Sequence, residues 1–521
     1  MTGIGIGIGI EWYVAPYTRR VKTVLPWMLA VLSGLCLALA MPGAGLAVLA
    51  FAAVPLLLEA LQHGEGRWRP WLLGWLAGAT FWIVATNWVL PVMHDYGGLP
   101  WPAAFLCLLG MGLILGIFWA LAAGLASLVP PAWRVWLLPA AWTAAPLLQR
   151  WPPFQFVWTG PAAAFVDWPW FMSTLPVWGA TGLGWWVAAL SAGVWGLVRS
   201  ATRLGAAAQS AVAICLLLAF SLAAPAARPA GEPLRVAVLQ PGTSLEDKWD
   251  PAQAGEIADK VWALTGAVAV RDADLVAWPE SAVPFRLDTD ASYREAVTRM
   301  ARELGIEIIL NSVASTGDGG YSNSAFLVTS EGVDATRYDK VHLVPFGEFV
   351  PSWAGFAFTE SLVREVGRFT PGRQPAVLPA RVPIGVAICF EVVFPGLPAA
   401  QVRDGAELLV TLTNDGWYGF SWAPHQHFAQ VRLRAAENRR WFVRAALTGI
   451  SGFVDPTGLV VASLGVGDDG FLIEEVQPMM GITPRARWGD WWGWLCVVAT
   501  VAILVVARLF RRAEAGEGEP R

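Results

Sequence analysis

The sequence from Trp101 to Trp133 reads WPAAFLCLLGMGLILGIFWALAAGLASLVPPAW and carries no charged side chain. A helix needs about 20 mostly apolar residues to cross the hydrocarbon core of a bilayer. Helices of this length on the surface of soluble proteins normally carry a polar face. The stretch therefore predicts a membrane-spanning helix.

Seven further apolar segments flank this stretch, so we expect a polytopic helical membrane domain with seven N-terminal spans plus one C-terminal span. The segment at 135–149 is the weakest, because Pro139 and Pro146 interrupt it, and a re-entrant loop is the alternative. The expected spans lie near residues 24–41, 45–62, 71–93, 101–129, 135–149, 172–197, 206–226 and 488–508.

The acidic residues divide the chain into two parts with different solvents. Only 15% of the 521 residues are charged, well below the roughly 25% of ordinary soluble proteins. Of the 40 acidic residues, 35 follow residue 230, which predicts a water-facing domain there. The net charge of −4 favours neither a nucleic acid nor an acidic substrate as partner. The five early acidic residues are Glu11, Glu59, Glu65, Asp95 and Asp167.

Basic residues in the short loops predict the orientation of the spans, because cytoplasmic loops carry an excess of Lys and Arg. With the N-terminus inside, the inner flanks hold eight basic residues and the outer short loops hold only Arg150. Both termini are then cytoplasmic, and residues 229–485 lie outside the cytoplasm. The eight are Arg19, Arg20, Lys22, Arg67, Arg69, Arg134, Arg199 and Arg203.

The first span has a second interpretation as a cleaved signal peptide, because basic residues precede it and Ala38-Leu39-Ala40 ends it. Its removal would spoil the alternation of basic flanks, so we favour an uncleaved span. The expected boundaries are a cytoplasmic N-terminus at 1–22, seven spans within 23–228, a catalytic domain at 229–485, the last span at 486–509 and a cytoplasmic tail at 510–521.

The water-facing part alternates strand-like and helix-like segments, which is typical of an α/β layered domain. Helical patterns lie at Ala252–Val268 and Tyr293–Leu304. The sequence shows no glycine-rich nucleotide motif and no Cys-x-x-Cys metal spacing, and we expect no cofactor and no metal. The expected strands are Arg235–Leu239, Leu275–Trp278, Ile306–Leu310, Ala325–Val328, Val382–Ile388 and Leu408–Leu412.

Reactive side chains follow two of these strands, where chemistry gathers in α/β sheets. Glu280 ends the run from Asp274, and Cys389 follows Val382–Ile388. Lys340 and Glu348 lie in one apolar loop between them in the sequence. A thiol nucleophile, a carboxylate base and an ammonium that stabilises an oxyanion make up an acyl-transfer site.

At these residues the chain resembles the nitrilase (carbon–nitrogen hydrolase) superfamily, whose catalytic set is Glu, Lys and Cys in that order. The motifs are W-P-E at Trp278–Glu280, D-K-x-H-L-V-P-F-G-E at Asp339–Glu348, C-F-E at Cys389–Glu391, N-D-x-W at Asn414–Trp417 and T-G-I-S at Thr448–Ser451. Joined to eight spans, the whole chain resembles the apolipoprotein N-acyltransferase family.

The resemblance implies an extracytoplasmic α-β-β-α sandwich, periplasmic on the cell inner membrane of a bacterium. It also implies a ping-pong reaction. Cys389 would take an acyl chain as a thioester from a phospholipid, typically phosphatidylethanolamine, and pass it to the α-amine of a diacylglyceryl-cysteine on an apolipoprotein. We expect a monomer without a nucleic acid partner.

The resemblance also assigns roles to individual residues. Glu280 matches the general base and Lys340 the oxyanion-stabilising lysine. Glu348 matches an additional essential carboxylate that could orient Lys340, and Glu391 matches a further glutamate beside the nucleophile. Trp249 matches a tryptophan that lines the substrate path.

Two positions depart from the family pattern. Phe390 follows the nucleophile where the family often has Tyr, so any role of a hydroxyl is lost. Leu447 stands in place of Asn before Thr448–Ser451, which leaves the local hydrogen bonding open.

Two other functions and one other catalytic mechanism fit parts of the sequence. A membrane-tethered amidase would use the same residues but finish the thioester with water. A transporter or scaffold would carry an inactive nitrilase-like domain, which the intact Glu280, Lys340 and Cys389 set argues against. A papain-like pair of Cys389 with His425 or His427 has no local signature; these histidines, two apart, lie on different helix faces and suit a metal poorly.

Overall fold

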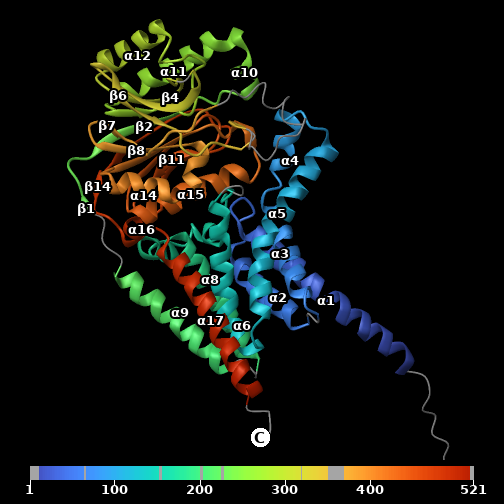
Figure 1. Ribbon diagram of the computed structural model, residues 1–521. Helices are drawn as coiled ribbons and strands as arrows, with labels where there is room; N and C mark the ends of the chain where they lie inside the picture. Colours follow the sequence, from blue (N-terminus) through green and yellow to red (C-terminus); the bar gives the residue numbers. More distant parts are fainter. Residues whose placement is uncertain are drawn as a thin grey trace, which may run out of the picture.

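The computed structural model describes residues 11–63, 66–151, 155–199, 203–223, 228–317, 319–345, 347–349 and 369–516. It has two parts, a bundle of apolar helices and an α/β domain that sits on one end of the bundle (Figure 1). The last helix, α17, returns from the α/β domain into the bundle.

Helices lie at all eight segments predicted to be spans. In the part of the chain that the structure describes, four are long and apolar enough to cross a membrane individually: Thr23–Ala40, Trp101–Ser127, Leu175–Val198 and Trp491–Ala513. The bundle helices are α1 (Glu11–Ala40), α2 (Ala50–Gln62), α3 (Arg69–Ala85), α5 (Trp101–Ser127), α6 (Pro131–Ala144), α8 (Leu175–Val198), α9 (Arg203–Ala223) and α17 (Trp491–Gly516).

The segment predicted as one span at 71–93 is bent by 68°. Helix α3 ends at Ala85, and α4 (Val89–Pro91) and a π turn at Val92–Tyr96 continue in a new direction. In Figure 1, α4 rises beside the α/β domain. The expected span at 135–149 also changes character, because α6 continues as a 3-10 helix at Ala145–Arg150 that contains Pro146.

Helices α3 and α5 pack closely because glycines face the partner helix. A Cβ on Gly116 of α5 would lie 2.8 Å from backbone atoms of both Ala79 and Trp75 in α3. Small residues of this kind let helix backbones approach each other within a membrane.

The α/β domain contains two six-stranded sheets. The first has the order β13-β2-β3-β4-β5-β6 and the second the order β12-β11-β10-β9-β8-β7. Strands β2, β3 and β4 are parallel, as are β8, β9 and β10. The strands are β2 (Leu234–Gln240), β3 (Leu275–Ala277), β4 (Glu307–Ser315), β5 (Tyr321–Thr329), β6 (Gly332–Asp339), β7 (Val377–Pro379), β8 (Pro383–Ile388), β9 (Leu408–Thr413), β10 (Phe442–Ala446), β11 (Ser451–Val454), β12 (Val460–Leu464) and β13 (Gly470–Val476).

Helices cover the outer face of each sheet, which gives the predicted α-β-β-α layers (Figure 1). Helices α11 (Ala254–Ala269) and α12 (Ala291–Leu304) cover the first sheet. Helices α14 (Gly396–Arg403) and α15 (Ala423–Asn438) lie between the second sheet and the bundle. Short elements complete the domain: β1 (Arg228–Pro229), α10 (Leu245–Trp249), β14 (Met479–Met480) and α16 (Pro484–Trp488).

The strands are apolar on both faces because each sheet is covered on both sides. Val236 and Val238 of β2 belong to the core between the sheets, with Val386 and Leu412 of the second sheet. The alternate residue Leu239 packs in the core under α11 and α12. This explains why the strands appear in the sequence as nearly continuous apolar runs.

Helix α15 joins the two parts through buried polar contacts. The amide of Gln426 accepts hydrogen bonds from the indoles of Trp88 (3.3 Å) and Trp158 (2.7 Å) and donates to the carbonyl of Ala85 (2.9 Å). Arg432 donates to Asp167 at 2.5 Å and to the carbonyl of Val166 at 2.6 Å. The α/β domain is therefore anchored on the bundle by specific contacts as well as by its chain ends.

Candidate active site

The ends of parallel strands bring the predicted reactive residues to one region between the sheets. Glu280 follows β3 by three residues, Lys340 directly follows β6, and Cys389 directly follows β8. Strands β3 and β8 belong to different sheets, so the site is built where the two sheets face each other.

Lys340 lies between two carboxylates. Its Nζ donates to Glu348 Oε1 at 2.8 Å and lies 3.6 Å from Glu280 Oε1. The Lys340 side chain is only 1% exposed. Burial alone would lower the pKa of Lys340, but the charges of Glu348 and Glu280 outweigh burial and raise this pKa above its usual value. Lys340 is therefore held as an ammonium in a dry site.

Two asparagines and the backbone fix the carboxylate of Glu280. The Asn323 amide donates to Glu280 Oε1 at 2.8 Å, and the Asn414 backbone N–H donates to Glu280 Oε2 at 3.0 Å. Asn311 in turn donates to the side-chain oxygen of Asn323 at 2.6 Å. Asn323 also donates to Glu348 at 3.0 Å, so one amide orients both carboxylates.

Cys389 lies at a sharp turn with a left-handed backbone, φ +53°. The turn joins β8 to a 3-10 helix at Cys389–Val393. Burial and the charge of Glu280 raise the pKa of the Cys389 thiol, and Lys340 partly offsets this rise. The thiol is thus protonated at neutral pH and must give up its proton as it attacks a carbonyl.

Glu391 is fully buried and connects the loop after β6 to strand β8. It accepts hydrogen bonds from the Tyr338 hydroxyl (2.7 Å) and from the backbone N–H groups of Val341 (2.7 Å), His342 (3.0 Å) and Ile388 (2.8 Å). Burial raises the pKa of Glu391 to about 7, against the effect of these donors. These hydrogen bonds fix the position of Val341, which follows Lys340, relative to Ile388, which precedes Cys389.

Behind Cys389 lies a buried group of three charged or titratable residues, Asp415, His427 and Arg444. His427 Nε2 lies 3.0 Å from the carbonyl oxygen of Cys389, so the histidine contacts the backbone of the nucleophile. This geometry differs from the papain-like pairing of a histidine with the thiol. His425 is exposed whereas His427 is buried, as expected for two residues on different faces of α15.

The two departures from the family pattern have structural consequences. The Phe390 ring stacks on Trp158 at 6.2 Å and contacts Phe394 edge-on at 5.2 Å, so it packs against the membrane part. Leu447 uses its backbone alone: its N–H donates to Thr413 at 3.0 Å, and its carbonyl accepts from Gly242 at 3.0 Å.

Some predicted features lie outside the described residues. Trp249 ends α10, but its side chain is among those left undescribed, as are most residues of the aromatic loop 346–369. Within the described ranges, no group of His, Cys, Asp or Glu side chains is arranged to hold a metal ion.

Sequence reasoning missed the residues that orient the reactive groups. Asn311 and Asn323 lie within strands β4 and β5 and belong to none of the motifs. Asp415 lies within the N-D-x-W motif, whose members have no role assigned from the sequence. This motif is the sequence signal that could have identified Asp415. Arg444 lies in β10, a strand that the sequence did not predict.

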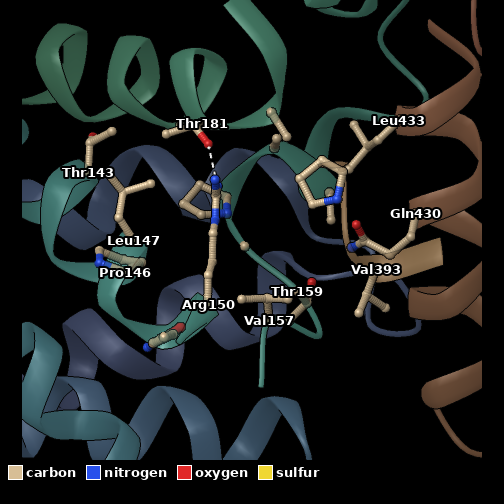
Figure 2. Close-up of a pocket in the computed structure, with 18 of the residues that line it drawn as sticks. Thr143, Pro146, Leu147, Arg150, Val157, Thr159, Thr181, Val393, Gln430 and Leu433 are labelled. Atoms are coloured by element: carbon tan, nitrogen blue, oxygen red, sulfur yellow. Dashed lines mark hydrogen bonds between the residues drawn. The ribbon is translucent and has the colours of Figure 1, made fainter. Parts of the chain in front are cut away.

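A separate cavity of about 160 Å³ lies where the bundle meets α15 (Figure 2). Arg150 extends into it and donates to Thr181 at 3.0 Å. Val393 and Gln430 line the side that belongs to the α/β domain. Glu280, Lys340 and Cys389 are not among the lining residues of this cavity, which is therefore distinct from the candidate active site.

Two protein-family models match this chain, one over each of its two parts. The carbon-nitrogen hydrolase family model matches residues 235–485, and the model of the apolipoprotein N-acyltransferase N-terminal domain matches residues 33–193. The crystal structure of Nit3 from Saccharomyces cerevisiae, a nitrilase superfamily member, is 20% identical with a TM-score of 0.38, covering 49% of this chain and 93% of that one.

Curated relatives match both parts together. The apolipoprotein N-acyltransferase of Geobacter metallireducens is 33% identical over 93% of this chain and 95% of its own length. That of Methylococcus capsulatus is 32% identical over 94% of this chain and 98% of its own. Because the similarity runs through the bundle, the α/β domain and the motifs around Cys389, this chain belongs to the apolipoprotein N-acyltransferase family.

Proposed function

We propose that this protein transfers an acyl chain from a membrane phospholipid to the N-terminus of an apolipoprotein, with Cys389, Glu280 and Lys340 as the catalytic residues. The observation that carries the proposal is the buried cluster in which Lys340 lies 2.8 Å from Glu348 and 3.6 Å from Glu280, and in which Glu280 and Lys340 both act electrostatically on the Cys389 thiol. The names of the relatives supply the substrate classes.

In the first half-reaction, the Cys389 sulfur attacks the ester carbonyl of the phospholipid sn-1 chain, and Glu280 takes the thiol proton. The oxyanion forms beside the Lys340 ammonium and a backbone N–H at the start of the turn after β8. The carbon–oxygen ester bond then breaks, Glu280 returns the proton to the leaving alkoxide, and a lysophospholipid departs. The acyl chain remains on Cys389 as a thioester.

In the second half-reaction, the α-amine of the diacylglyceryl-cysteine attacks the thioester carbonyl. Glu280 takes a proton from the amine, the carbon–sulfur bond breaks, and the Cys389 thiol is restored. Glu348 keeps Lys340 aimed at the oxyanion in both steps, supported by the 2.8 Å contact between them. Glu391 holds the lysine loop and the nucleophile strand together.

The membrane part supports a lipid donor over a water-soluble amide. The candidate site lies beside a largely buried aromatic group to which both parts contribute: Phe390 stacks on Trp158, and Tyr418 contacts Trp88 at 5.0 Å. Aromatic and apolar side chains are the usual lining of sites for apolar ligands. A phosphatidylethanolamine donor and a monomeric enzyme belong to this proposal. An amidase that ends with water is the alternative outcome of the test.

The test uses purified protein and phosphatidylethanolamine labelled in its sn-1 chain. We expect mass spectrometry to find a fatty-acyl adduct on the peptide that contains Cys389, and a diacylglyceryl-cysteine peptide to receive the label as an amide. Cys389→Ala should abolish both products, whereas Cys215→Ala in the membrane part should leave both unchanged. Labelled free fatty acid without acyl-peptide would favour the amidase, and a wild-type protein without the adduct would contradict the thioester mechanism.

We further propose the eight-span topology, with residues 229–485 in the periplasm and residues 1–22 and 510–521 in the cytoplasm. The support is the excess of basic residues on one side of the helices. Protease added to spheroplasts should cut within 229–485 and leave tags on both termini intact. Loss of a terminal tag from sealed spheroplasts would place that terminus outside the cytoplasm and contradict the proposed orientation.

A further inference from the structure

We propose that His427 is a positioning residue that holds the peptide group between Cys389 and Phe390 in the orientation needed for thioester formation. The inference rests on the proposed acyl transfer through Cys389. It assigns a role to the buried Asp415, His427 and Arg444 group, which the mechanism above does not use.

One ring nitrogen of His427 contacts Cys389, and the other contacts the buried ion pair of Asp415 and Arg444. His427 Nε2 lies 3.0 Å from the Cys389 carbonyl oxygen. Its Nδ1 lies 2.9 Å from Asp415 Oδ1 and 3.1 Å from Arg444 Nη2. Arg444 and Asp415 form an ion pair at 2.5 Å, and the side chains of all three residues are fully buried.

A carbonyl oxygen can only accept a hydrogen bond, so the Nε2 atom of His427 carries a proton and donates it to Cys389. Nδ1 of the neutral His427 then accepts a hydrogen bond from Arg444 Nη2 at 3.1 Å, and burial favours this neutral form because it lowers the pKa of His427. Asp415 holds Arg444 in place as its ionised partner, since the charge of Arg444 outweighs burial and keeps the pKa of Asp415 below its usual range. Arg444 is in turn anchored by a hydrogen bond from its Nε to the Ile450 carbonyl at 2.9 Å.

Fixing the Cys389 carbonyl also fixes the N–H of Phe390. The peptide unit is planar and trans, so its C=O and N–H point in opposite directions. Phe390 is the second residue of the 3-10 turn, where N–H groups have no partner within the helix. The hydrogen bond from His427 holds the Cys389 carbonyl on the side of the peptide away from the reacting thiol. The Phe390 N–H then points to the other side, where it can donate to the oxyanion.

The left-handed backbone at Cys389 explains why such support is required. A non-glycine residue at φ +53° is strained and persists only when its surroundings hold it. A buried hydrogen bond to the carbonyl of that same residue is a direct way to hold it.

The membrane part also contributes to this support. The Trp158 ring stacks on His427 at 5.1 Å on one side and on Phe390 at 6.2 Å on another. Its indole N–H donates to Gln426, the residue before His427, at 2.7 Å. The imidazole ring of His427 is thus packed against a tryptophan that lies 268 positions before Gln426 in the sequence.

A pair of amide variants separates positioning from packing. In His427→Gln, the amide nitrogen can reach the place of Nε2 and donate to the Cys389 carbonyl; the shorter side chain in His427→Asn cannot. We expect Cys389 acylation by labelled phospholipid to fall about 100-fold or more in His427→Asn, as when an oxyanion donor is lost, and to stay within about tenfold of wild type in His427→Gln. The two variants should unfold at similar temperatures.

The inference is overturned if His427→Asn acylates Cys389 as fast as wild type, or if both folded variants are equally slow. A second measurement needs no variant of His427. In wild-type protein labelled with ¹⁵N histidine and ¹³C-carbonyl cysteine, solid-state NMR should find a dipolar contact that disappears in Cys389→Ala. Absence of that contact overturns the inference even if the variants fail to fold. Because the contact is independent of turnover, a wild type without acylation would instead count against the proposed function.

Discussion

At the scale of single residues, the surroundings of Lys340 determine its chemistry. A lone surface lysine would be a hydrated and mobile charge. Lys340 is buried against Glu348 and Glu280, and Asn323 holds both carboxylates from the other side. The ammonium therefore serves two ends: it stabilises two buried carboxylates, and it lowers the pKa of the nearby Cys389 thiol relative to burial alone.

Replacing Lys340 with Met should slow the alkylation of Cys389 by iodoacetamide, because the thiol loses a cation that favours its thiolate. In wild type the pKa of this thiol is already raised by burial, so the alkylation rate should climb about tenfold per pH unit between pH 7 and 9 without a plateau. Peptide mass spectrometry measures the rate at Cys389. Lys260→Met is the control, since Lys260 is an exposed partner of Asp469. A plateau below pH 8 in wild type would contradict the prediction.

At the scale of elements, close packing of α3 on α5 depends on backbone approach at Gly116. A side chain there would come within 2.8 Å of two backbone atoms of α3, which cannot move without shifting the helix. Gly110 in the same helix has open space around its Cβ position. The pair distinguishes helix packing from helix propensity.

Gly116→Val should destabilise the protein by about 1–3 kcal/mol, the usual cost of overpacking, and lower its unfolding temperature in detergent. Gly110→Val adds the same side chain to α5 without a clash and should leave the unfolding temperature nearly unchanged. Scanning fluorimetry on both variants tests this prediction. Equal losses in the two variants would mean that β-branching within α5, not the contact with α3, sets the cost.

The same scale shows which elements the sequence could predict. The six expected strands correspond to β2, β3, β4, β5, β8 and β9, because strands covered on both faces leave continuous apolar runs. Strands β6 and β12 were missed because almost none of their residues are buried, and β10 because Arg444 interrupts its apolar run. The bend after Ala85 was missed because the hydropathy of a segment does not indicate whether its helix is straight or bent.

At the scale of the whole molecule, Gln426 couples the two parts. It pairs with the indoles of Trp88 and Trp158 and with the carbonyl of Ala85, all from the membrane part. A buried donor without a partner costs about 1–3 kcal/mol. Gln426 directly precedes His427, so loss of these hydrogen bonds should also disturb the position of His427 and, through it, of Cys389.

Gln426→Leu should therefore lower the unfolding temperature and also slow acylation of Cys389, because two buried indole N–H groups lose their acceptor. Gln477→Leu is the control, since the Gln477 amide bonds to Gly231 within the α/β domain. Melting curves and the rate of adduct formation report the two effects. A variant that melts early but acylates at the wild-type rate would show that the coupling is structural only.

The sequence alone predicted the apolar helices of the bundle, the layered α/β domain and Glu280, Lys340 and Cys389 as candidate reactive residues. These depend on local properties: runs without charge, apolar strands and short motifs at strand ends. Only the tertiary structure shows which residues surround that set, namely Asn323, Asp415, His427 and Trp158. Their contacts join residues far apart in the chain, for example 268 positions for Trp158 and Gln426, and no local sequence pattern indicates such contacts. Orientation in a buried site comes from packing and hydrogen bonds between distant elements, which exist only once the chain has folded.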